Sequence, residues 1–222
     1  MSPSTQDELL KKGFRPGDIE IVRNCVDHGV YRRTGVHRSP DPLVGYMGRL
    51  KKYKSVDHLL RAFAIFRASV PGAKLVVIGD GDDRRDLERS ANQLGIAGAV
   101  RFTGFVSEEE KVRLLQEAWF LVNPSSVEGW GLTVIEANAC GTAVIASDVP
   151  GLRDAIMDGE TGILYPYGNI DDLAGKMVRL TRDSQLRDRL GTAAQAWAGT
   201  FDWQRVAELT VELLRKKPGQ GS

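Results

Sequence analysis

The stretch SSVEGWGLTVIEANACGTAVIAS, residues 125–147, decides the fold prediction. It opens as a loop with two glycines, continues as the helix-like segment Thr133–Ala139 and ends in the apolar, strand-like run Ala143–Ser147. A further strand-like run, Phe120–Asn123, precedes the loop, so the order is strand, loop, helix, strand. This is the order of a βαβ unit, which places the loop at the carboxyl end of its first strand, where parallel sheets bind ligands.

The same alternation extends along the chain in both directions. The other predicted strands are Leu43–Met47, Lys74–Ile78, Val100–Thr103 and Ile163–Tyr165. The other predicted helices are Ser55–Val70, Asp83–Leu94, one opened by the capping box of Ser107 and Glu110, Ile170–Arg182, Ser184–Trp197 and one near Asp202–Lys216. The strands are short continuous apolar runs, as expected when helices cover both faces of a sheet. The sequence therefore predicts an α/β fold with a Rossmann-like, doubly wound parallel sheet.

The first forty residues follow a different pattern. Thr5–Lys12 predicts about two helical turns, and Ile19–Val22 predicts a short strand. His28–Pro42 is a basic segment that contains Gly, Ser and Pro, which is typical of a linker or the edge of a domain.

Composition excludes several classes of protein. The 222 residues carry 30 basic and 29 acidic side chains, a formal net charge of +1, which gives no electrostatic footprint for nucleic acid or an anionic membrane. The two cysteines and three histidines are scattered without the spacing of a zinc site, so we predict no metal. The polar N-terminus lacks a signal-peptide core and no run is long enough to cross a membrane, so we expect a cytoplasmic protein.

A basic loop follows the first strand of the main alternation. Gly48-Arg49-Leu50 leads into a lysine-rich run that ends at Lys54. A glycine lets a phosphate approach the backbone, and the arginine fork matches phosphate oxygens. A solvated basic loop explains the same residues equally well.

The loop after the second strand, Gly79-Asp80-Gly81, is not a dinucleotide-binding fingerprint, because Arg84 stands where that pattern needs its third glycine. A tight turn near a helix N-terminus explains these residues at least as well as contact with a ligand.

Two carboxylates stand out in the stretch quoted above. Glu128 lies in the loop, and Glu136 lies eight positions later, about one turn into the predicted helix. A carboxylate on a closely packed helix needs partners, and sugar hydroxyls are suitable ones because a carboxylate accepts several hydrogen bonds. The free N–H groups at the start of the same helix form an anion site. An acidic residue that stabilises the helix dipole is the structural alternative for Glu136.

These residues resemble a known family. The segment from Glu128 to Tyr165 resembles the E-x7-E signature region of retaining glycosyltransferase family 4, whose members have the GT-B fold. Gly48-Arg49-Leu50 with Lys54 resembles the family's phosphate-binding element. Leu75–Gly81 resembles its strand-GxG element, and Val100–Val106 resembles the segment that lines the base. The resemblance covers about residues 20 to 205, with the motifs in the same order.

The resemblance implies a role for each part of a nucleoside-diphosphate-sugar site, with UDP or GDP as the nucleotide. Arg49 and Lys54 would neutralise the donor diphosphate, and the N–H groups of Leu132 and Thr133 would hold the same phosphates. Glu136 would bind the ribose hydroxyls.

Further roles concern the reacting sugar and the base. Glu128 would contact the donor sugar near the reacting carbon, as the candidate catalytic residue. Phe105 and Val106 would bind the base. The glycines implied to allow close approach of the donor are Gly48, Gly79, Gly129 and Gly131. The family retains anomeric configuration and generally needs no metal or other cofactor.

The chain departs from the family pattern in two ways. Asn24-Cys25-Val26-Asp27 stands where the family usually has Asn-Gly-Val-Asp, so a ligand role for this loop is doubtful. In addition, a GT-B enzyme has an acceptor domain before its donor domain, and only about twenty residues here would belong to one. We divide the chain into a remnant of an acceptor domain (1–25), a linker (26–42), a nucleotide-sugar-binding domain (43–200) and a C-terminal helix and tail (201–222).

This division predicts one half of a GT-B fold. We expect the chain to bind donor but to transfer little sugar without an acceptor domain or subunit, and the full-length protein to lie in the cytoplasm or at the membrane periphery. Two alternatives stay open: a non-catalytic nucleotide-sugar-binding module, and an NAD-dependent oxidoreductase, against which the missing glycine fingerprint argues.

Overall fold

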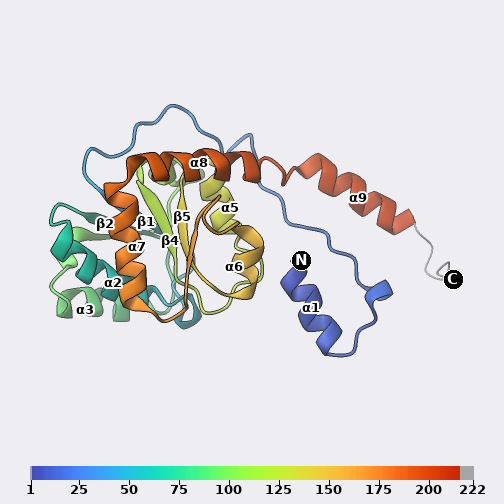
Figure 1. The fold of residues 1–222 in the computed structure, drawn as a ribbon, viewed down its shortest axis with the longest axis horizontal. Helices are drawn as coiled ribbons and strands as arrows, with labels where there is room; N and C mark the ends of the chain where they lie inside the picture. The colour runs from blue at the N-terminus through green and yellow to red at the C-terminus, as the bar shows by residue number, and fades with distance from the viewer. Residues whose placement is uncertain (1, 216–222) are drawn as a thin grey trace.

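Six short apolar runs pair into one parallel sheet in the computed structural model, which describes residues 2–215. The strands are β1 (Leu43–Met47), β2 (Lys74–Ile78), β3 (Val100–Gly104), β4 (Phe120–Asn123), β5 (Val144–Ser147) and β6 (Ile163–Tyr165). Their spatial order is β3-β2-β1-β4-β5-β6, and every neighbouring pair is parallel (Figure 1). The predicted doubly wound, Rossmann-like sheet is confirmed.

Helices alternate with these strands. They are α1 (Pro3–Lys11), α2 (Val56–Ser69), α3 (Arg84–Gln93), α4 (Glu108–Glu117), α5 (Leu132–Ala139), α6 (Pro150–Ala155), α7 (Ile170–Arg182), α8 (Ser184–Ala198) and α9 (Trp203–Arg215). Ser107 caps α4, because its hydroxyl accepts the N–H of Glu110 at 3.1 Å. The Glu110 carboxylate pairs with Arg113, so only this half of the expected capping box forms. The predicted helix end at Lys216 lies outside the described residues.

The helices bury the sheet on both faces. Within β2, Leu75 and Val77 pack into one core with α2, α3 and α7, whereas Val76 and Ile78 pack into a second core with α4, α5 and α6. Helix α8 contributes to both cores and lies across one end of the strands (Figure 1). Because neither sheet face is open to water, the strands read as continuous apolar runs rather than alternating ones.

One local prediction was wrong, and one helix was missed. The expected strand Ile19–Val22 is absent, and the chain here lies outside the sheet, as a coil that leads from the α1 side toward α8 (Figure 1). A four-residue run needs a neighbouring strand to pair with, and none lies beside it. The six-residue helix α6 was not predicted, because it is too short to show helical periodicity; Pro150 opens it.

Candidate functional site

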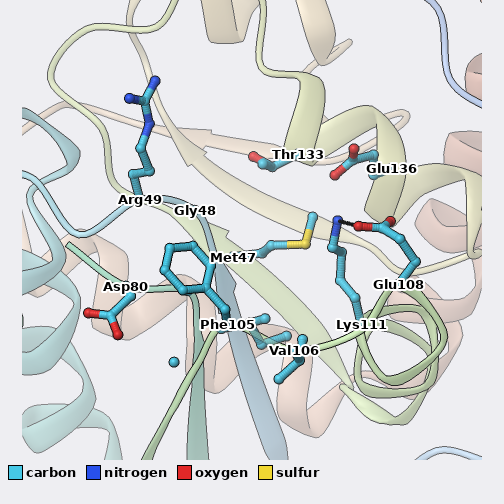
Figure 2. A pocket seen from close by; sticks show the side chains of 13 residues that line it. Met47, Gly48, Arg49, Asp80, Phe105, Val106, Glu108, Lys111, Thr133 and Glu136 are labelled. Carbon is cyan, nitrogen blue, oxygen red and sulfur yellow. Dashed lines mark hydrogen bonds and ion pairs between the residues drawn. The ribbon is translucent and has the colours of Figure 1, made fainter.

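A cavity lies at the carboxyl ends of β1 to β3, where the strand order reverses between β1 and β4. The chain crosses to opposite faces of the sheet after these two strands, which opens a crevice between their loops. The cavity has a volume of about 300 Å³. Its lining residues are Met47, Gly48, Arg49, Ile78, Gly79, Asp80, Gly104, Phe105, Val106, Glu108, Lys111, Thr133 and Glu136 (Figure 2).

The floor of the cavity is built by strand ends in backbone contact. The N–H of Gly48 donates to the carbonyl of Ile78, and the N–H of Gly79 donates to the carbonyl of Gly104, both at 3.0 Å. A side chain at Gly79 would place its Cβ only 2.1 Å from the Gly48 oxygen, at a φ of +126°. Gly79 is therefore required by the packing of the floor, whatever binds above it.

The adjacent Asp80 belongs to a tight turn. Its carboxylate accepts the N–H of Gly81 at 2.8 Å and pairs with Arg84 at 3.0 Å. The Gly81 hydrogen bond, helped by Arg84, holds the pKa of Asp80 below its ordinary value. The structural reading of the Gly79-Asp80-Gly81 loop thus accounts for its polar contacts, although Asp80 also lines the cavity.

In the part of the chain that the structure describes, some basic side chains of the loop after β1 form ion pairs with nearby carboxylates, and one does not. Lys51 pairs with Asp82, and Lys52 pairs with Asp83 and Asp86 beside α3. Arg49 lines the cavity and is exposed, and within residues 2–215 its guanidinium forms no ion pair (Figure 2). Of these three basic residues, Arg49 is the one in position to meet an anion in the cavity.

Lys54 is held by the other predicted site residue, Glu128. The Lys54 Nζ lies 2.5 Å from a Glu128 carboxylate oxygen, and the two side chains are only 12% and 16% exposed. The Ser125 hydroxyl lies 3.2 Å from the same oxygen and 2.7 Å from the Asn123 side-chain oxygen. The structure thus brings Lys54 and Glu128 together, but neither residue lines the cavity.

The start of α5 faces the cavity. Its N-cap is Gly131, with a φ of +74°, and no side chain caps the helix. Thr133 lines the cavity, whereas Gly129, Gly131 and Leu132 do not. The first N–H groups of an uncapped helix are suited to an anion, so α5 supplies the geometry expected of a phosphate-binding helix start.

Glu136 lies one turn into α5 and lines the cavity, half-buried (Figure 2). Burial is the main effect on this carboxylate and raises its pKa. Lys111 and the Tyr31 hydroxyl act in the opposite direction, while the charge of Glu108 adds to the rise. Glu136 therefore sits in an environment whose electrostatics depend on groups from other elements.

Sequence reasoning missed these groups. The Lys111 Nζ lies 2.8 Å from the Tyr31 hydroxyl and 2.6 Å from a Glu108 oxygen, and Tyr31 donates to the other Glu108 oxygen. Tyr31 lies in the segment predicted as a linker, yet it is buried. Because α4 follows β3, its first turn must lie at the carboxyl edge of the sheet, and this placement could have identified Glu108 and Lys111.

Residues 2–215 hold neither a candidate metal site nor a candidate membrane span. No group of three or more His, Cys, Asp or Glu side chains in this range is arranged to hold a metal ion. No helix in the same range is long and apolar enough to span a bilayer.

The chain matches a family described as glycosyl transferases group 1 over residues 29–197. It is 32% identical over 229 residues to glycogen synthase of Mycobacterium tuberculosis. The matched region covers 99% of this chain and 54% of that protein. The chain thus spans about half the length of this curated relative.

Two solved structures share the fold. Sucrose-phosphate synthase from Thermosynechococcus elongatus has a TM-score of 0.88 and 26% identity, covering 97% of this chain and 56% of that one. Anabaena HepE, solved in complex with UDP-glucose, has a TM-score of 0.87 and 24% identity, covering 96% of this chain and 62% of that one.

Proposed function

This chain belongs to the group 1 glycosyltransferases and forms their nucleotide-sugar donor domain. We therefore propose that the cavity where the strand order reverses binds a nucleoside-diphosphate sugar for retaining glycosyl transfer. UDP is the nucleotide to test first, because HepE, which has the same fold, was solved with UDP-glucose.

One observation carries the proposal. Arg49, Thr133 at the α5 start and Glu136 line a single cavity. Together they supply a cation and a helix N-terminus for phosphates, and a carboxylate for the ribose hydroxyls. Phe105 and Val106, on the β3 side of the same cavity, are then placed to meet the base.

The charge distribution suits departure of the nucleotide. Cleavage of the bond between sugar and phosphate leaves negative charge on the diphosphate and positive character on the sugar. Arg49 and the α5 N-terminus stabilise that developing negative charge. Lys54 joins them when a phosphate draws its ammonium away from Glu128, and this exchange frees the Glu128 carboxylate to face the donor sugar.

Transfer also requires an acceptor. Because the chain spans about half of the M. tuberculosis glycogen synthase that it resembles, we propose that acceptor binding belongs to a further domain or subunit. A non-catalytic nucleotide-sugar-binding module shares every donor contact above, so a transfer assay with that further part present separates the two readings.

Titration calorimetry of the chain with UDP, GDP, ADP, their sugars and NAD tests the proposal. A nucleoside diphosphate should bind, and Glu136→Ala should weaken it by about 1–3 kcal/mol, as for a lost charged hydrogen bond. The exposed Glu160→Ala is the matched control and should bind like the wild type. Binding of NAD without binding of any nucleoside diphosphate would contradict the proposal.

A further inference from the structure

The proposed function needs Glu136 to offer an ionised carboxylate to the ribose from a half-buried position. Resting on that function, we propose that Lys111 is a positioning residue. Clamped by Tyr31 and Glu108, its ammonium keeps the Glu136 carboxylate charged and turned into the cavity.

The first support is the shared location. Lys111 comes from α4 and Glu136 from α5, and both line the cavity together with Glu108. Figure 2 shows the Lys111 ammonium at the Glu136 side of the cavity, joined to Glu108 by an ion pair. The Lys111 side chain is 20% exposed, so its charge is only partly screened by water.

The second support is the clamp itself. Lys111 donates to the Tyr31 hydroxyl at 2.8 Å and to Glu108 at 2.6 Å. An ammonium has three N–H donors, and these contacts use two of them. The remaining donor is available to Glu136 or to a ligand, on an ammonium whose position is fixed from two sides.

Tyr31 makes the clamp rigid. Tyr31 is 6% exposed, and the Lys111 ammonium lies over its ring, 5.4 Å from the centroid. Burial raises the pKa of the Tyr31 hydroxyl above its ordinary value, so the group stays protonated and donates to Glu108. Glu108 thus accepts hydrogen bonds from both Tyr31 and Lys111. Within residues 2–215, Lys111 is the one cation among the groups that shift the pKa of Glu136.

Four effects determine the pKa of the Glu136 carboxylate. Burial raises the pKa of Glu136, Lys111 lowers it, Glu108 raises it and the Tyr31 hydroxyl lowers it. One turn further along α5, burial raises the pKa of the Cys140 thiol to about 12, so that thiol is neutral near pH 7. Removing the charge of Lys111 therefore moves the pKa of Glu136 further up.

The test is the pH dependence of UDP binding by Lys111→Met and wild type. Glu136 must be ionised, so at pH 6 the variant should bind UDP about tenfold more weakly, as for a lost charged interaction. The difference in UDP affinity between the two proteins should narrow toward pH 9, where the Glu136 carboxylate is ionised in both. Comparing the two proteins at each pH cancels the ionisation of UDP itself.

Controls separate this role from others. Lys111→Arg keeps the charge and should bind nearly as wild type, and the exposed Lys74→Met should change nothing. Pyrophosphate lacks a ribose, so Lys111→Met should bind it as wild type does. Tyr31→Phe keeps the buried ring and loses only the hydroxyl. It should show a loss of UDP affinity that depends on pH in the same way but is smaller, and this test holds even if Lys111→Met folds poorly.

The outcomes also separate this inference from the proposed function. If Glu136→Ala leaves UDP binding unchanged, the proposed site itself is wrong. If Glu136→Ala weakens binding but the Lys111→Met gap is constant with pH, or is equal for pyrophosphate, only the positioning role of Lys111 is overturned.

Discussion

Lys54 and Glu128, 74 residues apart in sequence, form an ion pair with 2.5 Å between nitrogen and oxygen. The two side chains are expected at different parts of the donor, one at the diphosphate and one at the sugar. They neutralise each other in a largely buried position. If a donor phosphate binds Lys54 as proposed, it replaces the Glu128 carboxylate as the partner of that ammonium.

This pair should be measurable in a double-mutant cycle. Lys54→Met and Glu128→Gln each leave a poorly exposed partner without its counter-charge, so each should destabilise the chain. The coupling free energy should be about 1–2 kcal/mol, within the range for contacting charged residues. Urea unfolding of the four proteins gives this value. Strict additivity would show that the pair does not form in solution.

Glu136 should illustrate a conflict between stability and binding. Its raised pKa means that the ionised carboxylate destabilises the folded state; this cost is absent below the ordinary pKa of 4.5 and grows as pH rises through the folded-state pKa. Glu136→Gln should therefore melt at a higher temperature than wild type at pH 7.5, with the gap closing toward pH 4. Exposed Glu160→Gln serves as the control. A Glu136→Gln chain less stable than wild type at pH 7.5 contradicts this reading.

The floor of the cavity should be intolerant of a single methyl group. Gly79→Ala forces a φ of +126° on alanine and drives its Cβ toward the Gly48 oxygen, so it should cost at least about 2 kcal/mol of unfolding free energy. Gly175→Ala is the matched control, since nothing lies within 4 Å of a Cβ there. In the middle of α7 it should stabilise the chain by about 0.5–1 kcal/mol. Equal effects at the two sites would count against the packing described.

Ser55 carries the one left-handed φ, 48°, among non-glycine residues 2–215, and its hydroxyl meets that of Tyr167 at 3.1 Å. Ser55→Gly and Ser55→Ala both remove this contact, and only glycine relieves the backbone. In thermal or urea unfolding, Ser55→Gly should therefore be more stable than Ser55→Ala by about 1 kcal/mol. An alanine variant as stable as the glycine variant contradicts a strained start to α2.

Much of the fold was predictable because the strands are buried on both faces. The run Lys74–Ile78 is apolar after its exposed first residue, the run Phe120–Asn123 is apolar up to its last residue, and both strands appear with the predicted bounds. Ile19–Val22 has similar residue types but no neighbouring strand, and propensity alone does not form a sheet. Helix α6 depends on Pro150 and on packing, and it leaves no periodic signal.

The site was predictable where chain topology fixes it. The loops that follow parallel strands meet at one edge of the sheet, and Gly48, Thr133 and Glu136 line one cavity there. Contacts between distant segments were not predictable in this way. Tyr31 lies 80 residues from Lys111, and no spacing rule connects a residue of a linker-like segment to a helix so far along the chain.

The most direct test of the central claim is to locate UDP on the chain by NMR. In a ¹⁵N-labelled sample titrated with UDP, the largest amide shifts should fall at Gly48, Gly104 and Thr133, which line the cavity. Gly141, in a separate pocket beside α8, should not shift. The Glu136→Ala variant should need more UDP for the same shifts. Shifts centred at Gly141, or none at saturating UDP, would contradict a donor site at the carboxyl edge of the sheet.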